Sequence, residues 1–470
     1  LALGNALAPK EIEPQNVGDY LKKQCDDRVS GYEKHYNELM KESLEEDQLG
    51  KNIPENESKQ DFKEDAKELD KRVENTQNSK PESELTAWDY LLIGNRAISE
   101  KDYNKAIFNF NMAIELNPKF AEAYNNRGFV YEEIKEYNKA IEEYSKVIKL
   151  IPEDESAYFY RGNVYADLKE FDKAIKDYSK AIELNPKFAE AYNNRGFVYE
   201  EIKEYDKAIE EYSKAIKLIP EDESAYFYRG NVYAKLKKYD KAIEDYSKAI
   251  ELKPDNVEAH ANLGNMYFDK GEYYKAIEKY SKAIELNPEY MKVYNNRGLA
   301  YDDLKEYDKA IGDYSKAIEL NPEYAEAYFN CGNAYLHLKE YDKAIKDYSK
   351  AIELNPEYAK AYYNRGLAYD HLKEYDKAIE NYSNAIKLNP ESAVMYNNRG
   401  NVYAELKEYD KAIDDYSKAI ELNPKFAEAY NNRGIVYRYK EEHDKAIGDC
   451  RKAIELSPKL ARHLSSIKRL

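Results

Sequence analysis

Asparagine recurs along this chain at a spacing that could serve the binding of an extended peptide. A side-chain amide donates a hydrogen bond to a carbonyl and accepts one from an N–H group, so a row of amides recognises a peptide backbone without reading its sequence. The row consists of Asn126, Asn194, Asn262, Asn296, Asn330, Asn364, Asn398 and Asn432. Tyr160 and Tyr228 interrupt it. The alternative explanation is that the sequence NNRG was copied when the chain was duplicated.

Phenylalanine and acidic residues accompany this row. Phe129, Phe159, Phe197 and Phe227 alternate with asparagine at neighbouring positions. Carboxylates follow at Glu132, Glu133, Glu200, Glu201, Asp302, Asp303 and Asp370. Exposed rings beside acids suit an extended ligand with apolar and basic groups, so we expect the eight asparagines and four phenylalanines to line a peptide-binding groove. The alternative is that these rings pack against neighbouring helices.

The elements that position these residues are repeats of 34 residues, of which residues 121–154 are representative. Tyr124, Gly128 and Tyr131 fall at helical spacing, and a second apolar set with the same period follows Glu136. Pro152 cannot continue the second helix and closes the unit. The pattern predicts two amphipathic helices joined by a short turn.

The motif resembles the tetratricopeptide repeat: an aromatic residue, a glycine four residues later, a tyrosine three further, then an alanine, a tyrosine and a closing proline. The glycine recurs at Gly94, Gly128, Gly162, Gly196, Gly230, Gly264, Gly298, Gly332, Gly366, Gly400 and Gly434. Eleven repeats, numbered here 1 to 11 with positions 1 to 34, therefore fill residues 87–460. The resemblance implies an all-α, right-handed superhelical solenoid of helix-turn-helix units whose first helices line the concave groove. It also implies a non-catalytic scaffold for protein–protein interaction, and residues 461–470 are predicted to form a C-terminal capping helix.

Parts of the array are near copies of one another. Residues 121–154 and 189–222 differ at only two positions, Asn138/Asp206 and Val147/Ala215, and residues 155–188 resemble 223–256. A pair of repeats was therefore duplicated. Cys331 and Cys450 occupy positions that arginine and tyrosine fill in other repeats, so both are expected to be core or wall residues.

Composition narrows the class of partner. The formal net charge of −17 disfavours nucleic acid and favours a protein or peptide with basic or apolar groups. The lysine, arginine and asparagine clamp with which some family members bind acidic chaperone tails is missing, since Asn125 and Phe159 stand at its first lysine position. No phosphate loop or catalytic triad is found, so we expect no enzymatic activity and no cofactor. His337 and His371 occupy equivalent positions of adjacent repeats, but a metal site needs more ligands.

The ends of the chain suggest a second function. Residues 1–86 form an acidic, non-repeat arm with 21 acidic and 13 basic residues, predicted to be partly helical or disordered alone. The last residues are basic, so head-to-tail contact between chains could build a filament. The opening LALGNALA is either the edge of a fragment or the remnant of a processed leader, which leaves the compartment open. No apolar run is long enough to span a membrane.

Overall fold

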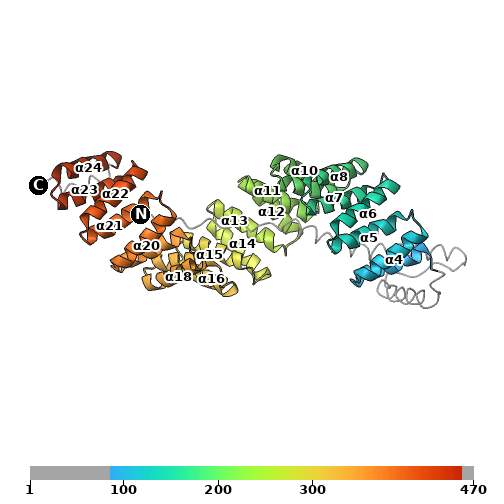
Figure 1. Ribbon diagram of the computed structural model, residues 1–470, viewed down its shortest axis with the longest axis horizontal. Coiled ribbons are helices and arrows are strands. Elements are labelled where there is room, and N and C mark those ends of the chain that lie inside the picture. Colours follow the sequence, from blue (N-terminus) through green and yellow to red (C-terminus); the bar gives the residue numbers. More distant parts are fainter. Residues whose placement is uncertain (1–84, 458–470) are drawn as a thin grey trace. The chain divides into compact units, whose positions relative to one another are not determined.

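Helices form every regular element of residues 85–457, the part of the chain that the computed structural model describes (Figure 1). The helices come in eleven pairs, one for each repeat, so the predicted all-α array of two-helix units is confirmed. The first helices are α3 (Ala87–Ser99), α5 (Ala121–Glu133), α7 (Glu155–Asp167), α9 (Ala189–Glu201), α11 (Glu223–Lys235), α13 (Val257–Asp269), α15 (Met291–Asp303), α17 (Ala325–His337), α19 (Ala359–His371), α21 (Ala393–Glu405) and α23 (Ala427–Tyr439). The second helices are α4 (Tyr103–Leu116), α6 (Tyr137–Leu150), α8 (Phe171–Leu184), α10 (Tyr205–Leu218), α12 (Tyr239–Leu252), α14 (Tyr273–Leu286), α16 (Tyr307–Leu320), α18 (Tyr341–Leu354), α20 (Tyr375–Leu388), α22 (Tyr409–Leu422) and α24 (His443–Leu456).

The described helices belong to two compact units. Residues 85–254 carry α3 to α12, and residues 255–457 carry α13 to α24. Within each unit a first helix packs against the second helix of its own repeat, and that second helix packs against the first helix of the next repeat. The predicted capping helix, residues 461–470, lies outside the described residues, as does the arm except for its last two residues.

The turn between the two helices of a repeat depends on one residue with a left-handed backbone. Lys135 has a φ of 62°, and in repeat 6 the equivalent residue is Gly271 with a φ of 74°. The turn lets the N–H of Glu136 reach back to the carbonyl of Tyr131 at 2.7 Å, which satisfies a carbonyl at the end of the first helix. The first helix therefore ends after 13 residues in each repeat.

A tyrosine at position 24 forms the centre of most repeats. Its ring is almost completely buried in repeats 2 to 10, at Tyr144, Tyr178, Tyr212, Tyr246, Tyr280, Tyr314, Tyr348, Tyr382 and Tyr416. The ring lies against the glycine at position 8 of the first helix. A Cβ atom added at Gly298 would stand 2.6 Å from Cε1 of Tyr314, closer than a real Cβ contact. The glycine thus allows the two helices to approach each other.

Replacing Gly298 by alanine is expected to destabilise the protein, by about 1 to 3 kcal/mol, because the buried Tyr314 ring has no room to move. Gly312 lies in α16 of the same repeat with nothing within 4 Å of an added Cβ, so Gly312→Ala is the matched control. The control is expected to stabilise by roughly 0.5 to 1 kcal/mol through helix propensity. Thermal denaturation of the three proteins measures both effects, and equal shifts would contradict the close-packing argument.

Candidate functional site

The predicted asparagine row lies in the contacts between repeats. Six of its members are buried, with at most 5% of each side chain exposed: Asn126, Asn194, Asn262, Asn296, Asn330 and Asn364. Asn398 and Asn432 are partly buried. The expectation that these amides face an open groove is therefore wrong for most of the row.

Hydrogen bonds explain this burial. The amide of Asn194 donates to Oδ1 of Asn163 in the preceding repeat at 2.9 Å, and the same oxygen accepts from the hydroxyl of Tyr178 at 2.8 Å. The same link from position 6 to position 9 joins Asn126 to Asn95, Asn296 to Asn265, Asn364 to Asn333 and Asn432 to Asn401. Asn330 and Asn398 donate instead to Asn295 and to the hydroxyl of Tyr363. Asn194, Asn296, Asn364 and Asn432 thus join the buried tyrosine of one repeat to the first helix of the next, because the oxygen to which each donates also accepts from that tyrosine.

The four phenylalanines are also buried. Phe129 is completely covered, and Phe159, Phe197 and Phe227 are at most 7% exposed. The ring of Phe159 packs 4.8 Å from that of Phe188, and Phe227 packs 5.9 Å from Tyr246. The expectation of exposed rings is wrong, and the alternative of packing between helices describes them. Peptide binding by these twelve residues stays a prediction, and it would require the contacts between repeats to open.

Carboxylates line the end of the first helices. They stand at positions 12 and 13, and we call them the acidic row of each unit. The first unit contributes Glu132, Glu133, Asp167, Glu200 and Glu201, and the second contributes Asp269, Asp302, Asp303, Asp370 and Glu405. These are mostly the carboxylates that the sequence predicted beside the peptide-binding groove.

The two copies of the duplicated pair of repeats in the first unit place different partners beside the carboxylate at position 12. In one copy Glu200 forms an ion pair with Lys235 of the next repeat at 2.9 Å. In the other copy the residue equivalent to Lys235 is Asp167. Burial, together with the nearby charge of Glu132, raises the pKa of Asp167 to about 7. Asp167 is not among the residues predicted from the sequence, although the duplicated repeats differ visibly here, with aspartate in one copy and Lys235 in the other.

In the second unit, Asp302 is a carboxylate without a counter-charge. Burial, and next the charge of Asp303, raises its pKa to about 7. In repeats 2 and 4 the longer Glu132 and Glu200 accept from the buried hydroxyls of Tyr144 and Tyr212. Asp302 Oδ1 and the hydroxyl of Tyr314 in the same repeat are both buried and find no hydrogen-bond partner in the described structure. The shorter aspartate side chain explains this difference.

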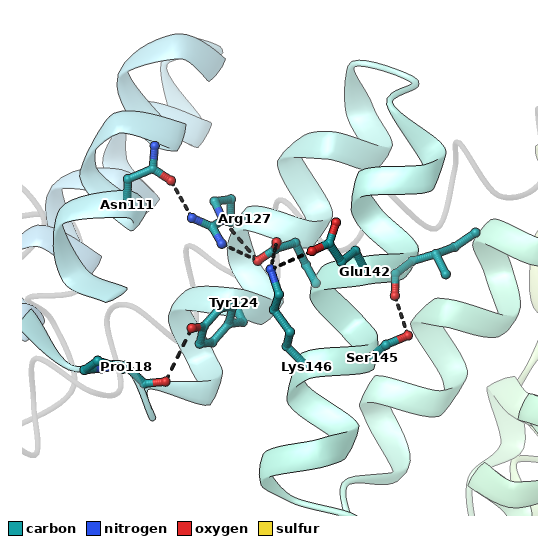
Figure 2. Close-up of polar contacts among 9 residues, drawn as sticks. Asn111, Pro118, Tyr124, Arg127, Glu142, Ser145 and Lys146 are labelled. Atoms are coloured by element: carbon teal, nitrogen blue, oxygen red, sulfur yellow. Dashed lines mark hydrogen bonds and ion pairs between the residues drawn. The ribbon is translucent and has the colours of Figure 1, made fainter. Parts of the chain in front are cut away.

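An arginine at position 7 bridges neighbouring repeats in what we call the arginine clasp. Its guanidinium pairs with a side chain at position 23 of its own repeat and donates to position 25 of the preceding repeat. Figure 2 shows the clasp of repeat 2, in which Arg127 on α5 contacts Asn111 on α4. The Nη2 atom of Arg127 also donates to Oε2 of Glu143 at 2.6 Å. Seven further clasps are built on Arg161, Arg195, Arg229, Arg297, Arg365, Arg399 and Arg433.

The two candidate metal histidines stack on tyrosines instead. The ring of His337 lies 4.9 Å from that of Tyr307, and His371 lies 5.0 Å from Tyr341. Burial lowers the pKa of His337. Residues 85–457 contain no cluster of three or more histidine, cysteine or acidic side chains arranged to hold a metal ion. Among helices α3 to α24, none combines the length and hydropathy needed to cross a bilayer.

Two family models match the repeats. The model described as "TPR repeat" matches residues 94–135, 162–203, 201–237, 230–266 and 264–304. The model described as "Tetratricopeptide repeat" matches residues 121–154, 292–324, 325–358, 359–392, 393–426 and 427–460. The chain belongs to the tetratricopeptide repeat family, whose repeats are typically non-catalytic and generally mediate protein–protein interactions.

Solved structures of repeat proteins align with parts of the chain, whereas no curated protein matches it. The MamA protein is 32% identical over 37% of this chain and 94% of its own, with a TM-score of 0.35. YrrB, described as a TPR protein with an unusual peptide-binding site, is 28% identical over 38% of this chain and 92% of its own, also with a TM-score of 0.35. The APC/C hetero-tetramer Cut9-Hcn1 is 16% identical over 82% of this chain and 96% of the matched chain, with a TM-score of 0.42.

Replacing Asp167 by asparagine is expected to stabilise the protein at about pH 8, by up to about 4 kcal/mol before screening by solvent. The folded-state pKa lies above the ordinary value of 3.8, so the folded state binds more protons between these values and stability falls as the pH rises. The gain should vanish near pH 4, at roughly the unfolded pKa.

Thermal denaturation across this pH range measures the effect. Lys235→Asn, the change at the equivalent position of the duplicated copy, is the control. It should destabilise at about pH 8, because it leaves the buried Glu200 without its ion pair. A gain from Asp167→Asn that persists undiminished at low pH would contradict the assignment.

Proposed function

We propose that this protein is a non-catalytic scaffold that binds an extended, basic segment of a partner protein along its acidic rows. The observation that carries the proposal is Asp302, whose buried Oδ1 lacks a hydrogen-bond partner among the described residues and whose pKa stands at about 7. A lysine or arginine of a partner would supply the missing counter-charge.

Neighbouring groups extend this acidic surface. Asp303 lies beside Asp302, and partial desolvation raises its pKa as well. Two repeats further on, burial raises the pKa of Asp370, an effect that the charge of His371 opposes and the charge of Glu405 increases. Carboxylates on α13, α15, α19 and α21, although α17 carries none at these positions, favour an extended ligand with several basic groups over a single bound cation. The net charge of −17 draws such a segment to the protein.

The family supports the general role, because its repeats generally mediate protein–protein interactions. The filament remains a prediction from the sequence. The arm and the basic tail that would join successive chains lie almost entirely outside the described residues.

Binding of a fluorescent peptide of alternating lysine and alanine tests the proposal, with a glutamate–alanine peptide as the comparison. The lysine peptide is expected to bind at low salt, and its affinity should fall about tenfold from roughly pH 8 to pH 6. The fall follows because Asp302 must lose its proton to pair with the cation. Fluorescence anisotropy measures this affinity.

Two variants in repeat 7 sharpen the test. Asp302→Asn should weaken binding several-fold and remove most of the pH dependence. Asp308→Asn removes an exposed carboxylate from α16 with the same change of charge, so the affinity for the lysine peptide and its pH dependence should stay unchanged. Equal binding of the two variants, or equal binding of the lysine and glutamate peptides, would overturn the proposal.

A further inference from the structure

Repeat 8 contains a pocket at the place where other repeats hold an arginine clasp. The pocket has a volume of 770 Å³ and is lined by residues of α16, α17 and α18, all in the second unit. Its wall includes Cys331 at position 7, Asp347 at position 23 and Ser315 at position 25 of the preceding repeat. These are the three positions that form the clasp elsewhere.

In repeat 3 the equivalent positions hold an intact clasp, which shows how these groups bind a guanidinium. Arg161 donates from Nε and Nη2 to the two carboxylate oxygens of Asp177 at 2.7 and 2.9 Å, and from Nη1 to Ser145 at 2.9 Å. The guanidinium carbon lies 5.8 Å from the ring centre of Tyr158 and 6.0 Å from that of Tyr165. The charge is therefore held by a bidentate carboxylate, a hydroxyl and two aromatic faces.

The pocket offers the same four groups. Asp347, Ser315, Tyr328 and Tyr335 line it, and they are equivalent to Asp177, Ser145, Tyr158 and Tyr165. Every residue that lines the pocket, apart from Cys331, has the same type as its equivalent in repeat 3. The difference between the two sites is thus one side chain, cysteine in place of arginine.

The shorter side chain of Cys331 leaves these groups accessible. The thiol hydrogen-bonds to Asp347 but cannot reproduce the fork of a guanidinium. Asp347 is partly exposed, whereas Asp177 is only 4% exposed. Ser315 is exposed, whereas Ser145 is partly buried. The carboxylate and the hydroxyl therefore open to solvent on the wall of a pocket.

Three lysines also line the pocket, and they do not prevent a cation from binding there. Lys343 pairs with Glu340, and Lys350 lies 2.5 Å from Glu353. Lys346 is exposed and adjoins Asp347. Repeat 3 has lysine at all three equivalent positions, including Lys176 beside Asp177, and still forms its clasp.

Repeat 6 provides a contrast. Its position 7 is Leu263 and its position 23 is Lys279, so the arginine and the acid were lost together. Repeat 8 keeps the acid after losing the arginine. A partly buried carboxylate that lacks its cation weakens a fold, and a bound cation would restore the pair.

We propose that the pocket of repeat 8 binds the guanidinium group of an arginine side chain from a partner polypeptide. The guanidinium takes the place that Arg161 occupies in repeat 3, with its fork on Asp347, one N–H on Ser315 and its faces against Tyr328 and Tyr335. Lysine fits poorly, because an ammonium cannot pair bidentately with the carboxylate and reach the hydroxyl. This site is separate from the acidic row, so neither proposal rests on the other.

Calorimetric titration of the full chain with acetyl-arginine-amide tests the proposal. Saturable binding at one site is expected, with affinity at least tenfold above that for acetyl-citrulline-amide or acetyl-lysine-amide. A second titration with a peptide that contains one arginine flanked by glycines tests whether the natural ligand is a polypeptide or a free amino acid. Tighter binding of the peptide supports a partner polypeptide, and a preference for the single amino acid overturns that part of the proposal.

Two variants reproduce clasps that the chain already contains. Cys331→Arg is expected to pair with Asp347, to raise the melting temperature and to abolish arginine binding. Asp347→Asn leaves the single carbonyl acceptor that Asn381 offers to Arg365 in repeat 9, so it should weaken binding about tenfold. Unchanged arginine binding by either variant would overturn the proposal.

The reverse change provides a gain of function. Arg161→Cys in repeat 3 should create a second pocket of the same composition, and the number of bound arginine ligands should rise from one to two. Arginine should also restore part of the melting temperature that this variant loses, whereas citrulline should not. Failure of the lysine–alanine peptide to bind would leave these results unaffected, since that test concerns Asp302.

Discussion

The tyrosine hydroxyl buried at the centre of repeats 2 to 10 needs an acceptor, and much of the polar structure depends on which group accepts from it. A buried hydroxyl without an acceptor costs about 1 to 3 kcal/mol. Asn163 accepts from Tyr178 in repeat 3, and Glu132 accepts from Tyr144 in repeat 2. Where asparagine is the acceptor, its oxygen also accepts a hydrogen bond from the next repeat. Where glutamate is the acceptor, a buried carboxylate lies at the end of the first helix. The choice of acceptor for the tyrosine therefore affects both the packing between repeats and the charge at the end of the first helix.

The sequence was sufficient to predict the repeats because glycine and tyrosine recur at fixed positions with helical spacing. Each repeat buries its face only against its neighbours, so the period alone specifies the architecture. The role of the asparagines could not be read in the same way. An amide has both donors and acceptors, and helical periodicity does not say whether Asn194 meets a ligand or Asn163. The burial of Phe159 depends on Phe188 at the end of the same repeat, which the sequence pattern could not place.

Charge is used differently at the two kinds of polar site. The arginine clasp encloses a cation and an anion of the same chain, so Arg297 and Asp313 are held at 2.7 Å and stabilise the contact between repeats. In the acidic row, Asp167 and Asp302 form no such ion pair within the described part of the chain, and burial raises the pKa of each carboxyl to about 7. The clasp links neighbouring repeats, whereas Asp167 and Asp302 in the acidic row keep charge that no cation among residues 85–457 neutralises. Repeat 8 combines both features, since it keeps the acid of a clasp beside a thiol.

The link from position 9 of one repeat to position 6 of the next also restricts how the array can change length. In the first unit this pair alternates between asparagine with asparagine, as in Asn163 and Asn194, and phenylalanine with tyrosine, as in Phe197 and Tyr228. Loss of residues 155–188 alone would set Asn194 against Phe129, so its amide would lose the Asn163 acceptor and would need one at position 5, as Asn330 finds in Asn295. Loss of residues 155–222 would set Tyr228 against Phe129 and preserve the match. A change of two repeats in this part of the chain therefore preserves the pairing between positions 9 and 6, whereas a change of one repeat requires a different hydrogen bond.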